Sequence, residues 1–186
     1  EYLTSRVGAP LEIRRVLVRD AENDRVPECR REWITTDVDE VLSKDIDVLV
    51  EVMGGEEPAK SLIERAIREG KGVVTANKLL LSKHGPGLVR MASDHGVDLA
   101  FEASVGGGIP IIRTLREALT SDWVESVHGI LNGTCNYILT RMRDGKVAFD
   151  VALAEAQAKG YAEADPTLDV DGHDAAQKLC VISMLA

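Results

Sequence analysis

The amino-acid sequence predicts an α/β fold, with a parallel sheet in the first half of the chain and part of an α+β domain in the second. Short apolar runs rich in valine alternate with amphipathic helical patterns up to residue 101. This alternation is typical of parallel strands joined by crossover helices. At residues 106–108 (GGG) the pattern changes to helices and one β-like run. We therefore expect two domains, one over residues 1–104 and the other over residues 105–186.

The expected strands of the first domain lie at residues 11–18, 46–53, 72–75 and 97–101. The run at 46–53 (IDVLVEVM) is nearly continuous in apolar residues, which indicates a strand that is covered on both faces. Helical patterns lie between the later strands, at residues 58–68 and 88–95. In the first of these patterns the apolar residues share one stripe, as in a helix that packs on a sheet.

The second domain is expected to be mainly helical. Helices are predicted at residues 111–119, 137–142 and 150–158 and from His173 onward, with a β-like run at 124–131. Asp150 is the expected N-cap of the third helix, and Gly160 after Lys159 its C-terminal stop, because Asp favours N-caps and Gly favours helix ends. Residues 144–146 (DGK) are typical of a turn.

Both ends of the sequence depart from a complete domain. A Rossmann-like nucleotide-binding sheet normally opens with a strand and a G-x-G-x-x-G turn, and neither precedes Leu11. The last helical pattern keeps an apolar face up to Ala186 without a capping residue. We therefore expect a Rossmann-like parallel sheet whose first strand and Gly-rich turn are missing, followed by a domain that is truncated at its C-terminus.

Composition argues against several classes of protein. The chain has 186 residues, of which 45% are hydrophobic and 28% charged, as in globular proteins and unlike disordered ones. Its formal net charge of −9 and the lack of a Lys/Arg-rich run argue against nucleic acid as a partner. No apolar stretch reaches the roughly 18 residues of a membrane helix, and no signal peptide is evident, so we expect a soluble protein that does not bind membranes.

The cysteines and histidines give no sign of a disulfide framework or a zinc site. Cys29, Cys135 and Cys180 are odd in number and widely spaced, which suits a reducing compartment, so we expect a cytoplasmic protein. The four histidines are equally scattered and lack the spacing of zinc ligands.

The densest polar cluster lies at residues 160–178 (GYAEADPTLDVDGHDAAQK) and holds five carboxylates within twelve residues. A calcium loop that begins at Thr167 would need Glu at its twelfth position, where Lys178 stands, so we reject that interpretation. A solvated acidic loop before a helix is one alternative. Asp174 and Lys178 share one helical face, either as a surface ion pair or as a carboxylate and an ammonium that face a cleft. The spacing leaves both open.

Two shorter motifs follow predicted strands. Lys78, in TANK (75–78), comes just beyond a buried strand, where open α/β sheets bind ligands. It could equally solvate the start of a helix. Gly54 and Gly55 follow the run at 46–53, where glycines permit either close approach of the backbone to a ligand or a tight turn.

Four segments together resemble homoserine dehydrogenase, and their order also matches: TANK (75–78), FEASVGGGIPII (101–112), NGTCNYI (132–138) and the acidic motif at 160–178. The resemblance extends over nearly the whole chain, from Leu11 onward. It implies an enzyme that interconverts L-homoserine and L-aspartate 4-semialdehyde with NAD or NADP, in the biosynthesis of threonine and methionine. It also implies that the second domain serves catalysis and dimerisation.

The resemblance implies roles for five residues at the substrate. Lys178 would donate a proton to the substrate oxygen or accept one from it, and Lys78 would assist from between nicotinamide and substrate. Glu163 and Asp174 would bind homoserine, including its ammonium group, with Asp169 in support. Hydride transfer to nicotinamide requires the hydroxyl proton to leave in the same step. A cationic nicotinamide nearby would lower the pKa of an amine, which fits the two lysines.

The expected cofactor-binding residues are Arg19, Gly54, Lys78 and Gly160. Arg19 ends a predicted strand at the place where an arginine can accommodate the 2′-phosphate of NADP, which slightly favours that cofactor. Asp20 follows directly, however, and an acidic residue there suits NAD. The choice between NADP and NAD therefore stays open.

The family also holds a monovalent cation, usually sodium, in a structural site of main-chain oxygens at positions that match Glu102, Val105, Gly107 and Ile109. The residues themselves leave a second interpretation open, in which the glycine run is a plain hinge between domains. A homodimer is expected from the resemblance and from the β-like run at 124–131, whose edge could pair across a two-fold axis.

Two rival functions have distinct requirements. Another dehydrogenase of similar layout, such as aspartate semialdehyde dehydrogenase, would need a nucleophilic cysteine, and Cys135 is the only candidate in a predicted loop. Alternatively, the chain is a catalytically inactive fragment that acts only as a dimerisation or binding module. Ligand binding discriminates an enzyme from such a module.

Overall fold

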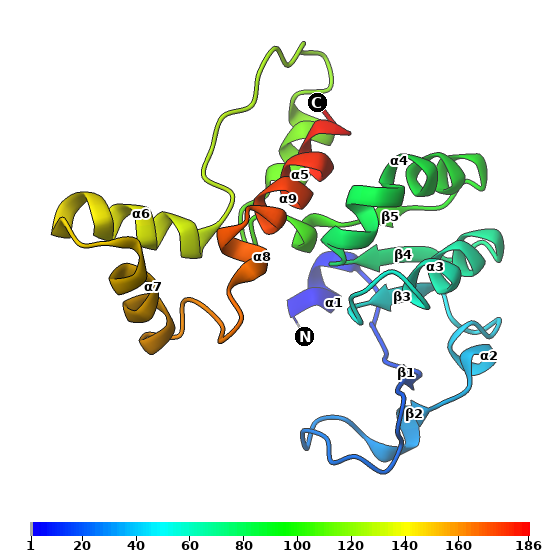
Figure 1. Cartoon of the computed structure of the whole chain (residues 1–186). Helices are drawn as coiled ribbons and strands as arrows, with labels where there is room; N and C mark the ends of the chain where they lie inside the picture. Colours follow the sequence, from blue (N-terminus) through cyan, green and yellow to red (C-terminus); the bar gives the residue numbers. More distant parts are fainter. Residues whose placement is uncertain (1) are drawn as a thin grey trace.

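A computed structural model describes residues 2–186, with side chains from Thr4 onward. The chain forms an α/β half and a smaller helical half, seen on the right and the left of Figure 1. A helix near the C-terminus runs between the two halves. Within the described residues, no helix is both long enough and apolar enough to cross a membrane.

A three-stranded parallel sheet forms the centre of the α/β half. Its strands, in spatial order, are β3 (Val48–Glu51), β4 (Gly72–Thr75) and β5 (Leu99–Ala100). The ladder between β3 and β4 ends with Glu51 opposite Thr75. β4 confirms the predicted strand at both ends, whereas β3 and β5 are shorter than the apolar runs that predicted them. The alternation of strands and helices thus gives the parallel sheet that it predicted.

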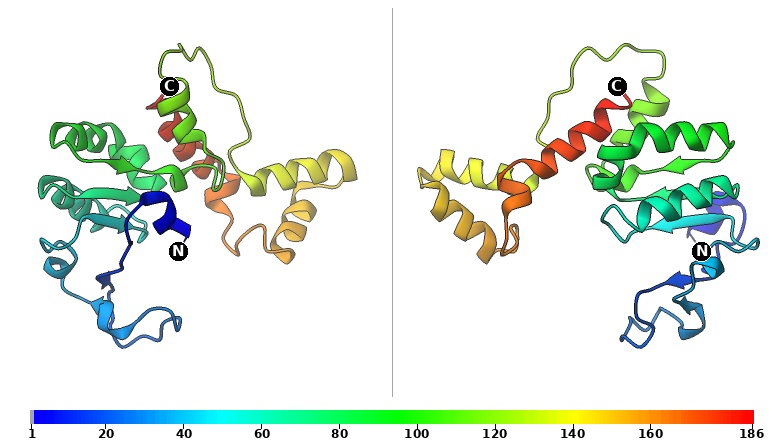
Figure 2. Two further views of the ribbon diagram at one scale, coloured as in Figure 1. Left: turned by 180° about the vertical axis from the view of Figure 1, so that it is seen from behind. Right: turned by 45° about the vertical axis from the view of Figure 1, so that its right-hand side comes forward.

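Two helices cover one face of this sheet (Figure 2), α3 (Ala59–Arg68) and α4 (Lys78–Asp94). Ile63 of α3 and Leu80 of α4 are fully buried against it. α4 begins at Lys78, ten residues before the predicted start at residue 88. The reason is a cap, because the side chain of Asn77 accepts a hydrogen bond from Leu80 N at 3.1 Å. The helix also continues through Pro86, although proline lacks an N–H group.

The opposite face of β3 is exposed, so the prediction of a strand covered on both faces is wrong. Val48 and Val50 are 51% and 61% exposed. Side chains alternate between the two faces of a strand, and only Leu49 and Glu51 lie on the side that packs against the core. The valine-rich run was consistent with burial, but burial requires a partner layer, and α3 supplies one on a single side.

A second, two-stranded parallel sheet pairs β1 (Val16–Leu17) with β2 (Ile34–Thr35). Three short helices complete this part of the chain: α1 (Tyr2–Val7), η1 (Arg31–Trp33) and α2 (Val38–Val41). The predicted strand at 11–18 is therefore wrong in extent, and Arg19 lies beyond the strand rather than at its end. β1 also does not join the main sheet, because within the described residues it pairs with β2 alone.

The later helices confirm the predicted ones in type and order. They are η2 (Glu102–Ser104), α5 (Ile111–Arg113) with its continuation η3 (Thr114–Ala118), α6 (Gly133–Gly145), α7 (Phe149–Ala158), α8 (Thr167–Val170) and α9 (His173–Ser183). α6 and α7 form the helical half, and α8 leads into α9, which returns to the α/β half (Figure 2). α9 ends at Ser183, so the prediction that this helix is still running at Ala186 is wrong.

Two further helix ends differ from the prediction. Asp150 is not an N-cap, because Ala148 holds that position and makes no side-chain cap; Asp150 lies in the first turn, where its charge favours the helix dipole. α6 includes Gly145, and its last residue is followed by Lys146 in the left-handed region (φ 51°). The predicted stop of α7 is confirmed, since Gly160 has a φ of 75°.

The β-like run at 124–131 is not a strand, so that prediction is wrong for the isolated chain. It forms an extended connection that projects away from both halves (Figure 1), and Trp123 at its start is 90% exposed. Within the described residues no strand pairs with it, and an unpaired strand is unstable in water. Pairing across a two-fold axis stays a prediction.

The described residues form two hydrophobic cores. The larger one fills the α/β half and also includes Ile112 of α5 and Val181 of α9. The smaller one holds Ile138 of α6 against Ala152 of α7. Because α9 packs along α4, it brings residues of the second predicted domain into the core of the first. This packing places the N-terminal ends of α4 and α9 beside each other.

Candidate active site

The centre of the site is the carboxylate of Asp174, in the first turn of α9. Asp174 is only 5% exposed and contacts two ammonium groups. One is Lys78 Nζ at the start of α4, which bonds to Oδ1. The other is Lys178 Nζ, one turn further along α9, at 2.7 Å from Oδ2. The spacing of Asp174 and Lys178 left a surface pair and a site pair open; the structure shows a buried carboxylate between two lysines.

Local structure explains why these three residues meet. Lys78 is the first residue of α4, which begins at the carboxyl end of β4 because Asn77 caps it. Gly172, in the left-handed region (φ 80°), precedes α9 and turns the chain so that Asp174 enters its first turn. Packing of α4 on α9 then brings residues 96 positions apart into contact.

The surroundings of Asp174 keep it ionised. Burial alone raises the pKa of this carboxyl group. Hydrogen bonds from the two lysines and from Asn132 outweigh burial and hold the pKa at about 2, below the ordinary 3.8. A carboxylate is therefore present at neutral pH, and it accepts from cationic donors on both of its oxygens.

Asn132, the N-cap of α6, is a site residue that the sequence analysis missed. Its Nδ2 group donates to Asp174 Oδ2 at 2.8 Å and to Asp169 Oδ1 at 2.7 Å. Its Oδ1 atom accepts from Cys135 N at 2.8 Å, which caps the helix. The signal was present in NGTCNYI, because Asn directly before a helix is a typical N-cap, but the predicted helix began only at residue 137. The link to both aspartates could not be read from spacing.

Lys178 has a second fixed partner. Its Nζ donates to the main-chain oxygen of Leu131 at 2.9 Å, in addition to Asp174. The side chain is 19% exposed. Since a lysine ammonium carries three N–H donors, these two bonds leave one donor free for another ligand.

A second network ties the loops that follow β3 and β4. Glu51, 2% exposed, accepts from the main-chain N of Met53 (2.8 Å) and of Gly54 (3.1 Å). Its other carboxyl oxygen accepts from Thr75 Oγ1 at 2.6 Å. Sequence analysis assigned no role to Glu51; the one available signal was a lone acidic residue at the end of a valine run. This network fixes the loop that contains Gly54.

Asn77 completes the junction between those two loops. Its Nδ2 donates to the main-chain oxygen of Gly55 at 2.7 Å, while its Oδ1 caps α4. Gly54 and Gly55 have φ of 73° and 75°, and a Cβ added to either would meet nothing within 4 Å. An open glycine backbone at the carboxyl end of β3 therefore lies in the loop that is tied to the residue before Lys78. Such strand ends are where open α/β sheets bind nucleotides, so these residues fit a dinucleotide.

Three predicted site residues are not joined to the Asp174 centre by any described contact. The side chain of Glu163 is exposed and makes no hydrogen bond or ion pair within residues 2–186. Arg19 is likewise exposed, on the loop after β1. Gly160 serves as the left-handed residue that ends α7. Their assignment to substrate or cofactor stays a prediction.

The four residues predicted to hold a cation lie in the turn between β5 and α5. The carboxylate of Glu102 is already used, because it accepts from the main-chain N of Ile112 (3.0 Å) and Arg113 (2.8 Å) at the start of α5. Val105 is buried, whereas Gly107 and Ile109 are exposed. Main-chain oxygens are the hard ligands that suit sodium, so the donor type fits. No cluster of three His, Cys, Asp or Glu side chains suited to a metal occurs in the part of the chain described.

Cys135 lies near the carboxylates but has the wrong chemistry for a nucleophile. It belongs to the first turn of α6 rather than to a loop, and its Sγ donates to the main-chain oxygen of Asp169 at 3.1 Å. Burial, and then the charges of Asp169 and Asp174, raise the pKa of the thiol. The reactive form of cysteine is the thiolate, so this environment argues against a thiol mechanism.

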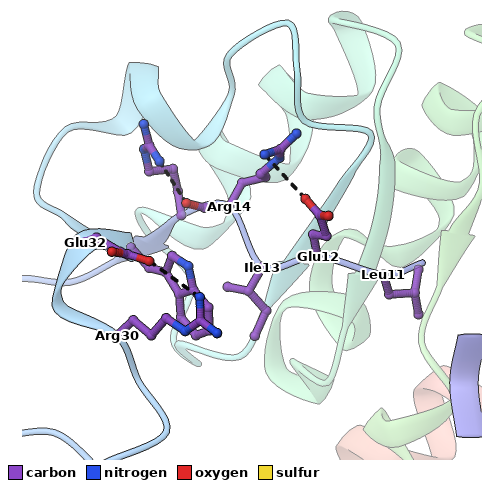
Figure 3. A pocket seen from close by; sticks show the side chains of 8 residues that line it. Leu11, Glu12, Ile13, Arg14, Arg30 and Glu32 are labelled. Carbon is purple, nitrogen blue, oxygen red and sulfur yellow. Dashed lines mark hydrogen bonds and ion pairs between the residues drawn. The ribbon is translucent and has the colours of Figure 1, made fainter. Parts of the chain in front are cut away.

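One hollow in the surface lies away from this site. It has a volume of about 740 Å³ and is lined by residues 11–15, Arg30, Glu32 and Trp33 (Figure 3). Its charges pair with one another, as in Arg14 with Glu12 at 3.4 Å, and Arg30 lies over the Trp33 ring at 5.0 Å. Because it is at the amino ends of β1 and β2, away from the Asp174 centre, we assign it no function.

Comparison with known proteins links both halves to one family. A model described as "Homoserine dehydrogenase, NAD binding domain" matches residues 2–102, and one described as "Homoserine dehydrogenase" matches residues 110–186. A homoserine dehydrogenase of Bacillus subtilis (strain 168) is 47% identical over 186 residues, which are all of this chain and 43% of the relative. The chain thus spans less than half the length of this curated relative.

Solved structures agree with that result. A homoserine dehydrogenase of S. aureus, at pH 7.5, has a TM-score of 0.82 and 39% identity over 100% of this chain and 43% of its own. A hyperthermophilic archaeal homoserine dehydrogenase in complex with NADPH has a TM-score of 0.73 and 31% identity. In that case the match covers 80% of this chain and 46% of the other.

Proposed function

This chain belongs to the homoserine dehydrogenase family, and on that premise we propose that it interconverts L-homoserine and L-aspartate 4-semialdehyde with a nicotinamide cofactor. The observation that carries the proposal is the buried carboxylate of Asp174 between Lys78 and Lys178. Lys78 begins α4 just beyond the end of β4 in a nucleotide-type sheet, and Lys178 comes from α9, which packs along α4. An ammonium group next to a cofactor-type strand end is suited to proton transfer, which supports the proposal.

The proposed chemistry couples hydride and proton transfer. A bound nicotinamide cofactor would supply the hydride chemistry at the carbon that bears the substrate oxygen. Lys178 donates a proton to the aldehyde oxygen in reduction and accepts the hydroxyl proton in oxidation. Its third N–H, unused by Leu131 and Asp174, is the one available to that oxygen. Lys78 assists from the cofactor side.

Asp174 has two tasks in this scheme. As a carboxylate with a pKa of about 2 it holds both lysines in place. Its two oxygens already accept three hydrogen bonds, and a carboxylate has about four lone-pair sites, so one remains for the ammonium group of homoserine. Asp169 supports it through Asn132, and Glu163 is proposed to reach the same ammonium group from its exposed loop.

We propose NADP or NAD as the cofactor, held by Arg19, Gly54, Lys78 and Gly160. The similarity to an archaeal relative in complex with NADPH supports NADP. The exposed Arg19 would contact a 2′-phosphate, whereas Asp20 next to it would suit the 2′-hydroxyl of NAD. The open backbone at Gly54 supports close approach of the cofactor to the sheet.

The remaining assignments follow the family. We propose a structural sodium ion on the main-chain oxygens of Glu102, Val105, Gly107 and Ile109. We also propose a homodimer, a division into domains at residues 1–104 and 105–186, and a place in threonine and methionine biosynthesis. The ends of the two matched family models, at residues 102 and 110, support that division. Three free cysteines support a reducing compartment such as the cytoplasm.

The test is homoserine-dependent reduction of NADP, followed by the near-ultraviolet absorbance of the reduced cofactor. Lys178→Ala should abolish turnover and leave cofactor affinity nearly unchanged, because Lys178 acts on the substrate oxygen. Lys60→Ala, an α3 lysine paired with Glu64 and outside the site, is the matched control and should keep full activity. Cofactor binding without turnover in the parent protein would instead favour an inactive module, which the chain's coverage of 43% of a relative also allows.

A further inference from the structure

We infer that Asn132 is a positioning residue, which sets where Lys178 presents its amino group. This inference rests on the proposed function, since Lys178 is the proton donor and acceptor in that scheme. Asn132 itself is not placed at the reacting atoms. It acts through Asp174 and through the neighbouring main-chain oxygen of Leu131.

The contacts form a closed ring. Leu131 O accepts from Lys178 Nζ (2.9 Å), and Lys178 Nζ also donates to Asp174 Oδ2 (2.7 Å). The same Oδ2 atom accepts from Asn132 Nδ2 (2.8 Å), and the peptide bond between residues 131 and 132 closes the ring. Lys178 is therefore held from two sides by one dipeptide, which gives it less freedom than a single ion pair would.

The orientation of the Asn132 amide is fixed by its helix. Oδ1 must face Cys135 N to cap α6, at 2.8 Å, so the NH₂ group must face the opposite way. There its two hydrogens go to Asp169 and Asp174. Asn132 is 6% exposed, and within the described part of the chain no buried side-chain nitrogen or oxygen lacks a partner. Only an amide supplies an acceptor for the cap and two donors for the carboxylates.

Asn132 has two roles, as the cap of α6 and as a donor to the carboxylates, and one substitution can separate them. Asn132→Asp keeps the capping oxygen, because Asp is as good an N-cap as Asn. It removes both donors and adds a third carboxylate next to Asp169 and Asp174. Asn132→Ala removes the cap and the donors together. A residue that only caps α6 would be rescued by Asp, whereas a positioning residue would not.

The experiment measures two quantities in the parent and in both variants. The first is the steady-state activity, given by kcat and KM with homoserine, and cofactor affinity is determined alongside it. The second is the rate at which an amine acetylating reagent modifies Lys178, relative to Lys60 in the same molecule. Ala152→Gly is the control, because it weakens α7 in the helical half by a similar amount without touching the site. Circular dichroism confirms folding of each protein.

We expect both Asn132 variants to lower kcat by about tenfold or more, the effect of losing one hydrogen bond to a charged group. Cofactor affinity should not change. Acetylation of Lys178 should become at least about twofold faster in Asn132→Ala as the ring loosens, and slower than in the parent in Asn132→Asp, where the added carboxylate keeps the amine protonated. The control should change neither. If Asn132→Asp matches the parent in both quantities, the inference is overturned and Asn132 is a cap alone. If the parent has no turnover, the proposed function fails, and the acetylation rates still decide the inference.

Discussion

The buried carboxyl groups of Glu51 and Asp174 each accept several hydrogen bonds from neighbouring segments, and the two groups differ in the kind of donor. Among the described residues, Glu51 accepts from neutral donors alone, namely two main-chain N–H groups and the hydroxyl of Thr75. Asp174 accepts from two ammonium groups and an amide. Both are nearly inaccessible to solvent, yet only one of them organises groups that can exchange a proton.

This difference distinguishes a carboxylate that fixes the backbone from one that organises a catalytic site. The partners of Glu51 lie within its own loop or directly opposite it in the β3–β4 register, so its network fixes backbone. The partners of Asp174 come from α4, α6 and α9, and two of them are lysines that keep part of their surface in solvent. Burial of a carboxyl group is therefore not sufficient to indicate an active site. Charged partners that are still accessible to solvent are the stronger indication.

The largest expected effect is on Asp174. Asp174→Asn removes the charge that holds both lysines, and we expect kcat/KM to fall by about a hundredfold or more. Steady-state assays with homoserine measure it, with circular dichroism to confirm folding. Asp171→Asn, an exposed carboxylate three residues earlier, is the control and should leave the rate within about twofold. Equal rates in both variants would remove Asp174 from the site.

The pH dependence of stability should carry the signature of Asp174. Its pKa in the folded chain is about 2 and its ordinary value is 3.8, so the folded state favours the ionised form. The resulting stabilisation is fully present above about pH 4 and is lost as the pH falls toward 2. It amounts to about 2 kcal/mol. Urea unfolding across this range should show the loss in the parent and not in Asp174→Asn; parallel curves would contradict it.

Glu51→Gln should have a smaller effect, and on stability rather than on chemistry. Glutamine keeps one oxygen for the N–H groups of Met53 and Gly54 but turns an NH₂ group toward Thr75, whose hydroxyl then loses its acceptor. We expect a loss of about 1–2 kcal/mol in unfolding free energy, measured by urea titration. Glu125→Gln, on an exposed loop residue, should cost nothing measurable. If Glu51→Gln lost turnover without losing stability, Glu51 would act in the chemistry as Asp174 does, and the proposed difference between them would be wrong.

The smallest effect is expected for Cys135. Because its surroundings raise the pKa of the thiol, Cys135→Ala should retain most activity, within about threefold. Cys180→Ala, at an exposed cysteine, provides the comparison. Complete loss of turnover in Cys135→Ala alone would revive the thiol mechanism.

Predictions from the sequence succeeded where the relevant information was local. The strand β4 follows directly from its apolar run, and the helices α3, α6 and α9 were predicted from apolar patterns, although the ends of α6 and α9 differ from the predicted ones. The position of Lys78 just beyond the carboxyl end of β4 was predicted correctly, because only two residues separate it from the strand. The prediction failed for the runs at 11–18 and 124–131, where strand formation depends on a neighbour rather than on the run itself.

Candidate site residues divide in the same way. Asp174 and Lys178 could be paired in advance, since four residues on one helix fix their relation. Lys78 could not be joined to them without knowing that α4 packs on α9. Asn132 and Glu51 were not identified from the sequence, because the partners that give them their roles lie in other elements.

The sequence by itself determined the α/β class, most of the helices and the residue types that carry the chemistry, because periodicity, caps and motifs act within a few residues. Tertiary structure alone decided which carboxylate is buried, which lysines reach it, and that one asparagine links two aspartates to a helix cap. Those properties depend on how α4, α6 and α9 pack, and packing joins residues that are far apart in the chain. Desolvation and hydrogen bonding at that junction then give the carboxylate of Asp174 its low pKa.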